Sequence, residues 1–307
     1  MISYNSGDVV EACLAALSEF APSWDVLVVD NASSDDTVER VRTRGTRVIA
    51  NRENRGFAGA VNQAFRETQS ELVLILNPDV ELRSSLEPLA EACRNAGVAG
   101  GRLTDATGTN QTGFTIRRLP TATVLALELL GVNRIWPGNR WNRKYRYLDR
   151  DLESGGPAEQ PAGAFLMIRR DACNTLGGFD ESFHPVWFED VDFCARAKAA
   201  GYEIQYVPEA VGRHLGGHSI QKIDESSRQL YWYDSLIRYA GKHLGVGGYR
   251  VVCIAAGLGV IPRSTLRMFQ TGSLRPASNC FRILKFVGRR LVSGPPSGLA
   301  QRPGIDN

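Results

Sequence analysis

The chain has 307 residues, of which 43% are hydrophobic and 22% charged, the composition of an ordinary folded soluble protein. That length allows one large domain, or one domain with an appendage. The formal net charge is only +3, but no acidic residue occurs between Asp234 and Asp306, where eleven Lys and Arg residues lie. This asymmetry predicts an anionic partner surface for the C-terminal part of the chain.

The six cysteines form no CxxC pair, and most lie in apolar helical surroundings. This favours small buried thiols of a reducing compartment over a disulfide framework or a zinc site. The N-terminus has neither a basic region nor an apolar run, so we expect no secretory signal. The longest apolar stretch, Val251 to Ile261, is shorter than the roughly 20 residues that span a bilayer. We therefore expect a cytoplasmic protein.

The first hundred residues alternate between strand and helix patterns. Ile2-Ser-Tyr resembles the end of a first strand, and the apolar runs at 25–30, 47–50 and 71–76 are typical of buried parallel strands. Apolar residues at helical spacing predict helices between these runs and after the last one, over Ser84 to Ala96. This order predicts an α/β fold with a doubly wound, mainly parallel sheet and helices on both faces.

Polar residues collect where the predicted strands end. Tyr4 and Asn5 follow the first strand, Asp30 ends the second, and Asp79 follows the fourth. Because ligands of such sheets bind beyond the carboxyl ends of the strands, we expect a nucleotide there. The first turn reads Asn5-Ser-Gly-Asp and lacks the GxGxxG pattern, which argues against a dinucleotide.

After Gly100 the regular alternation stops. Asp105 to Gln111 is rich in turn residues and predicts a hairpin tip, and Thr121 to Gly131 predicts a short helix. Trp136 to Asp149 is aromatic and basic without a clear period, so we expect a long loop of the kind that binds ligands. Its basic residues lie on no recognisable nucleic-acid module, and no nucleic-acid partner is expected. Pro161-Ala-Gly-Ala-Phe predicts a strand entered through small residues, which would let a substrate approach the backbone.

The stretch from His184 to Arg196 places Glu189, Asp190 and Asp192 within four positions, at the start of a predicted helix. Asp190 lies near the helix N-terminus, where backbone N–H groups favour an ionised carboxylate suited to a general base. An N-cap within a solvated acidic turn is the competing interpretation, and these residues alone favour it because capping aspartates are common.

Two of the four histidines, His214 and His218, share a glycine-rich stretch. They could be metal or diphosphate ligands, or simply two surface residues of a loop. Their spacing alone does not decide between these alternatives.

Eight motifs then carry a family resemblance: Ser3-Tyr-Asn-Ser, Val28-Val-Asp-Asn-Ala-Ser-Ser-Asp-Asp-Thr, Asn54-Arg-Gly-Phe-Ala-Gly-Ala-Val-Asn, Leu76-Asn-Pro-Asp-Val, Pro161-Ala-Gly-Ala-Phe, Gly177-Gly-Phe-Asp-Glu, Phe188-Glu-Asp-Val-Asp-Phe-Cys, and His214 followed by Gly217-His-Ser. In this order and spacing, residues 1 to about 219 resemble a bacterial glycosyltransferase of family 2 with the GT-A fold. The motifs are most similar to the rhamnosyltransferase branch, which extends cell-surface polysaccharides.

The resemblance implies a role for each matching residue. Asp190 would be the catalytic base with Glu189 in support, and Asp192 would be structural. Asp79 and His214 would hold Mg²⁺ or Mn²⁺ on the donor diphosphate, and Asp30 would pair with the nucleotide base beside Tyr4. The implied nucleotide-sugar-binding set is Ser3, Tyr4, Asn5, Asp30, Asn54, Gly56, Phe57, Asn62 and Asn77. The implied acceptor-binding set is Gly163, Ala164, Trp187 and Phe188.

The implied reaction is an inverting transfer from a dTDP- or UDP-linked donor to a cell-surface polysaccharide or lipid-linked glycan. Rhamnose from dTDP-rhamnose is the favoured donor sugar, with another hexose or galactofuranose as alternatives. A catalytically silent subunit that binds nucleotide sugars or glycans is the competing function. The chain departs from the family in two places: Asn77 replaces the first aspartate of the DxD motif, and only Met1 and Ile2 precede the first motif, where a full strand is usual. The second departure implies a start further upstream or a truncated copy.

The predicted organisation is a catalytic domain over 1–225, with a nucleotide-binding half at about 1–103 and an acceptor-binding half at about 104–225. A basic helical region would follow at 226–292, and a disordered tail at 293–307. Phe281 to Leu291 is apolar with interspersed arginines, which fits either a helix docked on anionic lipid or a helix whose arginines face water. Docking would make the protein peripheral on the inner face of the cytoplasmic membrane.

Overall fold

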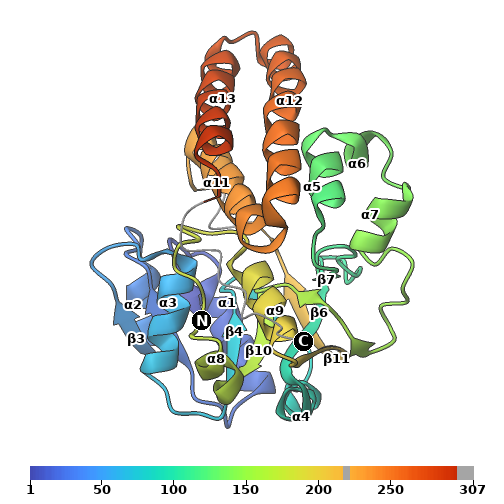
Figure 1. The fold of residues 1–307 in the computed structure, drawn as a ribbon. Helices are drawn as coiled ribbons and strands as arrows, with labels where there is room; N and C mark the ends of the chain where they lie inside the picture. The colour runs from blue at the N-terminus through green and yellow to red at the C-terminus, as the bar shows by residue number, and fades with distance from the viewer. Residues whose placement is uncertain (217–221, 296–307) are drawn as a thin grey trace. The chain divides into compact units, whose positions relative to one another are not determined.

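The computed structural model describes residues 1–216 and 222–295. The chain divides into two compact units (Figure 1): unit 1 is Met1–Leu119 with Lys144–Asp224, and unit 2 is Pro120–Arg143 with Glu225–Asn307. Residues 120–143, which the sequence assigned to the acceptor-binding half, thus belong with the C-terminal helices. His218, the Gly217-His-Ser motif and the predicted disordered tail from residue 296 onward lie outside the described residues.

The first sheet of unit 1 is parallel, as the sequence predicts. Its strand order is β1-β2-β3, with β1 at Ile2–Ser3, β2 at Leu27–Asp30 and β3 at Arg47–Ala50. Ser3 pairs with Asp30, and Asp30 pairs with Ala50, so the carboxyl ends of the three strands meet at one edge. The loops that follow these ends therefore lie together, as a nucleotide site of this class requires.

The second sheet is mixed, which differs from the mainly parallel arrangement that was predicted. Its order is β4-β10-β6-β11-β5, and only the β6–β11 pairing on this path is parallel. The difference arises because β10 comes from far along the chain and inserts between β4 and β6. Local pattern cannot reveal such an insertion. The strands of unit 1 after β3 are β4 Leu72–Leu76, β5 Val80–Leu82, β6 Gly97–Thr104, β7 Ile116–Arg117, β8 Gly156–Pro157, β9 Gln160–Pro161, β10 Phe165–Arg169 and β11 Glu203–His214.

Helices cover both faces of these sheets, and the α/β prediction is confirmed. Along β10, Phe165 and Met167 face one buried cluster with α1 and α4, while Leu166 and Ile168 face another with α3, α8 and α9. Strand side chains alternate between faces, so one buried strand serves both cores. The helices of unit 1 are α1 Val10–Phe20, α2 Thr37–Thr43, α3 Gly56–Arg66, α4 Glu87–Ala96, α8 Arg170–Thr175 and α9 Glu189–Ala199.

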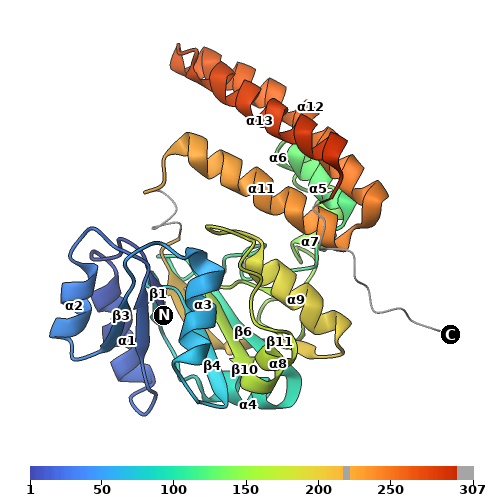
Figure 2. The same ribbon diagram turned by 60° about the vertical axis from the view of Figure 1, so that its left-hand side comes forward.

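Unit 2 is helical in its described part. Figure 2 shows α12 and α13 side by side as a long hairpin, and α12 also packs on α5 and α11. The predicted loop at 136–149 is partly wrong, because it contains a helix over Arg140–Tyr145, whose short amphipathic run is below the length that periodicity resolves. The helices are α5 Ala122–Leu129, α6 Val132–Ile135, α11 Glu225–His243, α12 Gly245–Thr271 and α13 Arg275–Ser293, together with α7 Arg140–Tyr145, whose last two residues belong to unit 1.

Helix α12 is longer than the apolar stretch that the sequence suggested. By length and composition it could cross a membrane, and it is the single helix of the described residues that meets this test. Only 39% of its most apolar window is buried within the structure. Several apolar side chains of α12 are therefore exposed.

Candidate active site

The loop after β1 is fastened to the loop after β2 by the carboxylate of Asp30, which is 1% exposed. Its Oδ1 accepts hydrogen bonds from the hydroxyls of Ser3 (2.8 Å) and Ser33 (2.5 Å), and Oδ2 accepts from the Ser33 backbone N–H (2.9 Å). Asn5 adopts a positive φ of 49° and its Oδ1 accepts from the backbone N–H of Ser34 at 2.8 Å. Asp30 therefore organises the loop that carries the partly exposed Tyr4.

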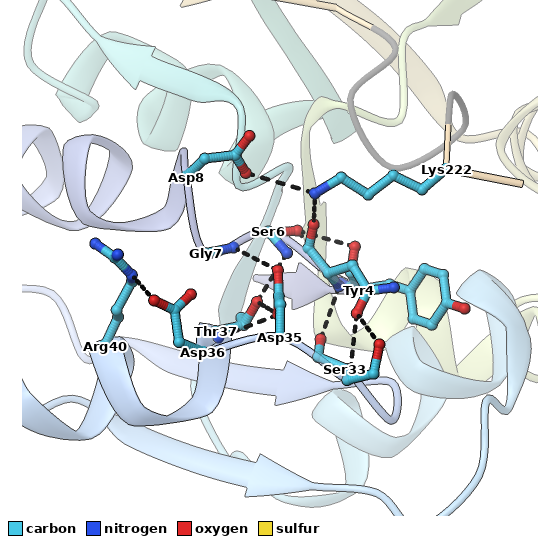
Figure 3. A network of polar contacts seen from close by, with 12 residues as sticks. Tyr4, Ser6, Gly7, Asp8, Ser33, Asp35, Asp36, Thr37, Arg40 and Lys222 are labelled. Atoms are coloured by element: carbon cyan, nitrogen blue, oxygen red, sulfur yellow. Dashed lines mark hydrogen bonds and ion pairs between the residues drawn. The ribbon is translucent and has the colours of Figure 1, made fainter.

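The same loop is held on its other side by a second polar network (Figure 3). The Asp35 carboxylate accepts from the Gly7 N–H at 3.1 Å and from Thr37, and the Lys222 ammonium donates to the Asn5 carbonyl and lies 3.5 Å from Asp8. Burial opposes ionisation of Asp35, but the hydrogen bonds from Thr37 and Gly7 outweigh it and lower its pKa. These hydrogen bonds stabilise the ionised Asp35 carboxylate, and together with Lys222 they fix the backbone of the loop after β1.

Two residues of the third motif shape the entry to α3. The Asn54 side chain accepts from the Gly56 N–H at 2.9 Å. Gly56 has a φ of +74°, and a Cβ there would lie 2.8 Å from the His184 ring, so the position requires glycine. The Phe57 N–H then donates to the Pro185 carbonyl at 2.8 Å, which ties this entry to the segment before Asp190.

Two members of the predicted nucleotide set have other tasks in the structure. Both ends of the Asn62 amide are engaged: Oδ1 accepts from the Phe179 N–H at 2.8 Å, and Nδ2 donates to the Phe179 carbonyl and to Glu181. Phe57 packs against the core cluster that contains α3. The structure therefore gives both residues a supporting function, and their contact with a nucleotide sugar stays a prediction.

Asp79 and His214 are brought together by the pairing of β5 with β11. His214 pairs with Val80, the residue after Asp79, and the Leu215 N–H donates to the Asp79 carbonyl. His214 thus lies at the end of a strand, whereas the sequence suggested a loop. Its Nε2 is 3.5 Å from Asp79 Oδ2, and the residues are 4% and 5% exposed. Burial lowers the His214 pKa, although the Asp79 charge opposes this, so the neutral ring is favoured.

This pair fits a divalent cation that has further oxygen ligands. A neutral imidazole nitrogen and a carboxylate oxygen are suitable donors, and Mg²⁺ is commonly held by one or two protein groups together with substrate phosphates. Among the described residues, no group of three or more His, Cys, Asp or Glu side chains could hold a metal by itself. A metal here would therefore need further ligands, such as water molecules or the oxygens of a bound phosphate.

Asp190 lies in the first turn of α9, as predicted, and its carboxylate is held by three donors. Oδ2 accepts from the Gly163 N–H (2.9 Å) and from Gln160 (3.2 Å), and Oδ1 accepts from the Val191 N–H (2.8 Å). Burial raises its pKa, and the hydrogen bonds and the nearby Arg117 guanidinium oppose the rise. A carboxylate with a fixed orientation and a raised pKa is suited to accept a proton.

The neighbouring carboxyls differ sharply from Asp190. Glu189 is 5% exposed, and its Oε2 has no hydrogen-bond partner among the described residues. Burial, reinforced by the charge of Asp190, raises the Glu189 pKa well above its usual range. Asp192 is fully buried and pairs with Arg196 at 2.8 Å, which agrees with the structural role expected for it. Trp187 and Phe188 both have positive φ angles, 83° and 68°, immediately before α9.

The Asp79–His214 pair and Asp190 are both supported by the predicted segment of small residues, Pro161-Ala-Gly-Ala-Phe. Gly163 contacts Asp190, and the next residue, Ala164, accepts a hydrogen bond from the Asn77 N–H at 3.0 Å. A Cβ on Gly163 would lie 3.0 to 3.4 Å from the Asp190 side chain, so this close approach favours glycine. The Asn77-Pro78-Asp79 motif and Asp190 are thus connected through two consecutive backbone contacts.

Sequence reasoning missed three residues in the segment that begins at the end of the predicted hairpin tip. Gln111 hydrogen-bonds to His214, and the Phe114 ring stacks on the His214 ring at 5.0 Å between centroids. Arg117 lies near enough to Asp190 to oppose the rise in its pKa. No periodicity marks these positions, and the segment is brought to the site by the pairing of β7 with β9 and by hydrogen bonds to the end of β6.

The family follows from a comparison of the whole N-terminal part of the chain. The family model described as "Glycosyl transferase family 2" matches residues 1–177, more than half of the chain. The chain belongs to glycosyltransferase family 2. A second model, "N-terminal domain of galactosyltransferase", matches residues 150–216 of this family 2 glycosyltransferase, which include Asp190 and His214.

Curated relatives of this family 2 glycosyltransferase include rhamnosyltransferases. It is 28% identical over 266 residues to the N-acetylglucosaminyl-diphospho-decaprenol L-rhamnosyltransferase of Mycobacterium tuberculosis, covering 80% of this chain and 84% of the relative. It is 22% identical over 188 residues to rhamnosyltransferase WbbL of Escherichia coli K12, covering 59% and 66%.

Solved structures show the same fold. The mannosyltransferase PcManGT of Pyrobaculum calidifontis, in complex with GDP-Man and Mn²⁺, has a TM-score of 0.53 at 16% identity, over 95% of this chain and 85% of that one. GalNAc-T7 with UDP, GalNAc and Mn²⁺ has a TM-score of 0.58 at 11% identity, over 96% and 57%. The fold is therefore of the GT-A type, as the sequence predicted.

Proposed function

We propose that this family 2 glycosyltransferase transfers a sugar from a nucleotide-sugar donor to a hydroxyl of a glycan or lipid-linked glycan, with inversion at the anomeric carbon. The observation that carries the proposal is the joint support of the Asp79–His214 pair and of Asp190 by Gly163 and Ala164. One site suits the donor diphosphate, and the other suits a proton acceptor. A catalytically silent binding subunit would not need both.

Asp190 is the proposed base. It accepts the proton of the acceptor hydroxyl as that oxygen forms a bond to the anomeric carbon. The bond from this carbon to the donor phosphate oxygen breaks, and its electron pair leaves with the nucleoside diphosphate. The three hydrogen bonds to the Asp190 carboxylate fix its orientation, and its raised pKa makes it a better proton acceptor. Trp187, Phe188 and the small residues Gly163 and Ala164 are the proposed acceptor contacts.

Asp79 and His214 are the proposed ligands of a Mg²⁺ or Mn²⁺ ion. When bound, such an ion would offset the negative charge that develops on the departing diphosphate. The chain's own part is to hold a buried carboxylate oxygen and a neutral imidazole nitrogen 3.5 Å apart at the strand ends. The Mn²⁺ bound in the two similar structures supports this proposal.

The nucleotide is proposed to lie on the loop organised by Asp30, against Tyr4 and Asn5, with Ser3, Asn54, Gly56 and Asn77 along the same edge. The carboxylate of Asp30 already accepts three hydrogen bonds, so it contributes one remaining acceptor position on Oδ2 to the base. We propose rhamnose from dTDP-rhamnose as the donor, because two curated relatives are named as rhamnosyltransferases.

A donor panel tests the proposal. The full chain is incubated with dTDP-rhamnose and with UDP- and GDP-linked sugars, and release of nucleoside diphosphate is measured with Mn²⁺, with EDTA, and after Mn²⁺ is restored. We expect turnover of one donor that EDTA abolishes and Mn²⁺ restores. Nucleotide binding without turnover of any donor would instead establish the silent subunit. Turnover that EDTA leaves unchanged would exclude the metal assignment.

We also propose that the protein works at the cytoplasmic face of a membrane, and that α12 makes the contact rather than the predicted Phe281–Leu291. What supports α12 is a row of apolar side chains, each about half exposed or more, that recurs every three or four residues from Val251 to Ile261 and continues about two turns later at Phe269. Such a row suits the interface of a bilayer. Its members are Val251 (47% exposed), Ile254 (51%), Leu258 (58%), Ile261 (47%) and Phe269 (83%).

The charges of unit 2 favour anionic lipid as the partner of this row. Several exposed cations have no acidic partner among the described residues, namely Arg250, Arg275, Lys285 and Arg289. Arg290, by contrast, pairs with Asp234 at 2.7 Å and is occupied inside unit 2. Cations beside an apolar face are attracted to acidic headgroups. A lipid-linked acceptor, of the kind named for the mycobacterial relative, would be reached there.

A further inference from the structure

Gln111 forms two hydrogen bonds to the same residue, His214. Its Nε2 donates to the His214 carbonyl at 2.9 Å, and its Oε1 lies 2.9 Å from the His214 Nδ1. An amide nitrogen can only donate, so its bond to the carbonyl determines which end of the Gln111 amide faces the ring. Oε1 is therefore the acceptor, and Nδ1 carries the proton.

This bond decides the state of the other ring nitrogen. A neutral imidazole has one N–H, so a proton on Nδ1 leaves a lone pair on Nε2. Nε2 faces the Asp79 Oδ2 at 3.5 Å, and both residues are buried. Two acceptors that face each other at this distance repel unless a cation lies between them. With the opposite tautomer, Nε2–H would donate to Asp79 and occupy the position that a metal needs.

Gln111 is itself rigidly held. Its N–H donates to the Leu103 carbonyl at 2.9 Å, and its carbonyl accepts from the N–H groups of Phe114 (3.0 Å) and Thr115 (2.9 Å). The Phe114 ring lies almost parallel to the His214 ring, with an interplanar angle of 12°. The imidazole is thus constrained from its edge and from its face.

We propose that Gln111 is a positioning residue that locks His214 in the Nδ1–H tautomer, so that Nε2 and Asp79 are prepared for a divalent cation. Outer hydrogen bonds of this kind typically change metal affinity by about 10- to 100-fold. The proposal rests on the proposed function only in assigning a cation to the pair. The tautomer itself is a property of the metal-free protein.

The test uses the full chain at pH 8 and two measurements. Nitrogen-15 NMR of the imidazole side chains reports the tautomer without metal, with His214→Gln to assign the signal. Mn²⁺ affinity is measured by electron paramagnetic resonance. Gln111→Leu removes the acceptor for Nδ1–H, Gln111→Glu retains it, and Gln205→Leu, which removes a surface amide of β11, is the matched control.

We expect the Nδ1–H tautomer in the wild type, in Gln111→Glu and in Gln205→Leu. Gln111→Leu should give the Nε2–H tautomer and about 10- to 100-fold weaker Mn²⁺ binding. An Nε2–H signal in the wild type would overturn the proposal even if Gln111→Leu does not fold, and so would wild-type Mn²⁺ affinity in folded Gln111→Leu. The expected tautomer without any Mn²⁺ binding would support the lock and refute the proposed metal.

Discussion

The two units of this glycosyltransferase use charge in opposite ways. Unit 1 contains 29 Asp and Glu residues against 21 Lys and Arg, whereas unit 2 contains 4 against 15. In unit 1 the carboxylates of Asp30, which is buried, and Asp190, which is half-buried, are each held by hydrogen bonds from named donors. In unit 2 several cations are exposed, and so are several large apolar side chains. A hydrogen-bonded carboxylate interacts with individual atoms of a ligand, whereas a set of exposed cations attracts an extended anionic surface.

The largest effect is expected from a substitution of the proposed base in unit 1. Asp190→Asn keeps the size of the side chain but removes the proton acceptor, so kcat should fall about a thousandfold. Nucleotide binding, measured by calorimetry, should stay near that of the wild type. Asp171→Asn, which changes an exposed carboxylate of α8, is the control and should leave kcat unchanged. Full turnover by Asp190→Asn would refute the base assignment.

The second prediction concerns the exposed apolar row of α12 in unit 2. Ile254→Gln combined with Leu258→Gln and Phe269→Gln should weaken binding to phosphatidylglycerol-containing vesicles about tenfold or more, because burial of the apolar row is lost. Flotation with and without that lipid measures the effect, and turnover of a soluble acceptor should not change.

Leu148→Gln, at an exposed apolar position of unit 1, is the matched control for the vesicle experiment. Flotation of the triple variant at the wild-type level would exclude α12 as the contact. Loss of a dimer in light scattering, with unchanged flotation, would assign the row to a second copy of the chain instead.

A third prediction concerns the effect of the buried Glu189 carboxyl on the free energy of unfolding. Glu189 has a raised pKa in the folded state, so above its unfolded pKa of about 4.3 the folded protein retains a proton that the unfolded chain has lost. The free energy of unfolding should therefore fall as pH rises, by up to about 1.4 kcal/mol per pH unit between the two pKa values.

Glu189→Gln should remove this loss, so its stability advantage in urea unfolding should grow from pH 4 towards pH 8. Glu91→Gln, at an exposed position of α4, should give no such trend. A constant difference between Glu189→Gln and the wild type across this range would contradict the raised pKa.

The smallest expected effect concerns the charge beside the base. The Arg117 guanidinium holds the Asp190 pKa below the value that burial alone would give. Arg117→Gln should therefore move the acid limb of the kcat/KM profile to higher pH, by less than about one unit. Arg117→Lys retains the charge and should leave the limb in place. The Arg117 guanidinium also lies over the Phe114 ring, 5.7 Å from its centroid, so movement of the limb in both variants would show that this packing, rather than charge, is what matters.

Much of unit 1 could be predicted because its signals are local. Apolar runs and helical spacing predicted β2, β4 and α4, and the motifs predicted which residues meet at the strand ends. The helix at Glu189 followed from its spacing and the stop near Gly201. Asp190, Asp79 and His214 could be named in advance only through the resemblance to family 2 glycosyltransferases, because the residues alone also allowed a helix cap and a surface histidine.

The remaining features depend on contacts between distant segments. Only the tertiary structure inserts β10 between β4 and β6, groups residues 120–143 with the C-terminal helices, and commits Asn62 to the loop at Phe179. The sequence by itself determined the elements and the chemical groups of this glycosyltransferase. Gln111 decided which nitrogen of His214 faces Asp79, and Arg117 is the cation that opposes the rise in the pKa of Asp190. Both interactions depend on distance in space, so no periodic pattern in the sequence predicts them.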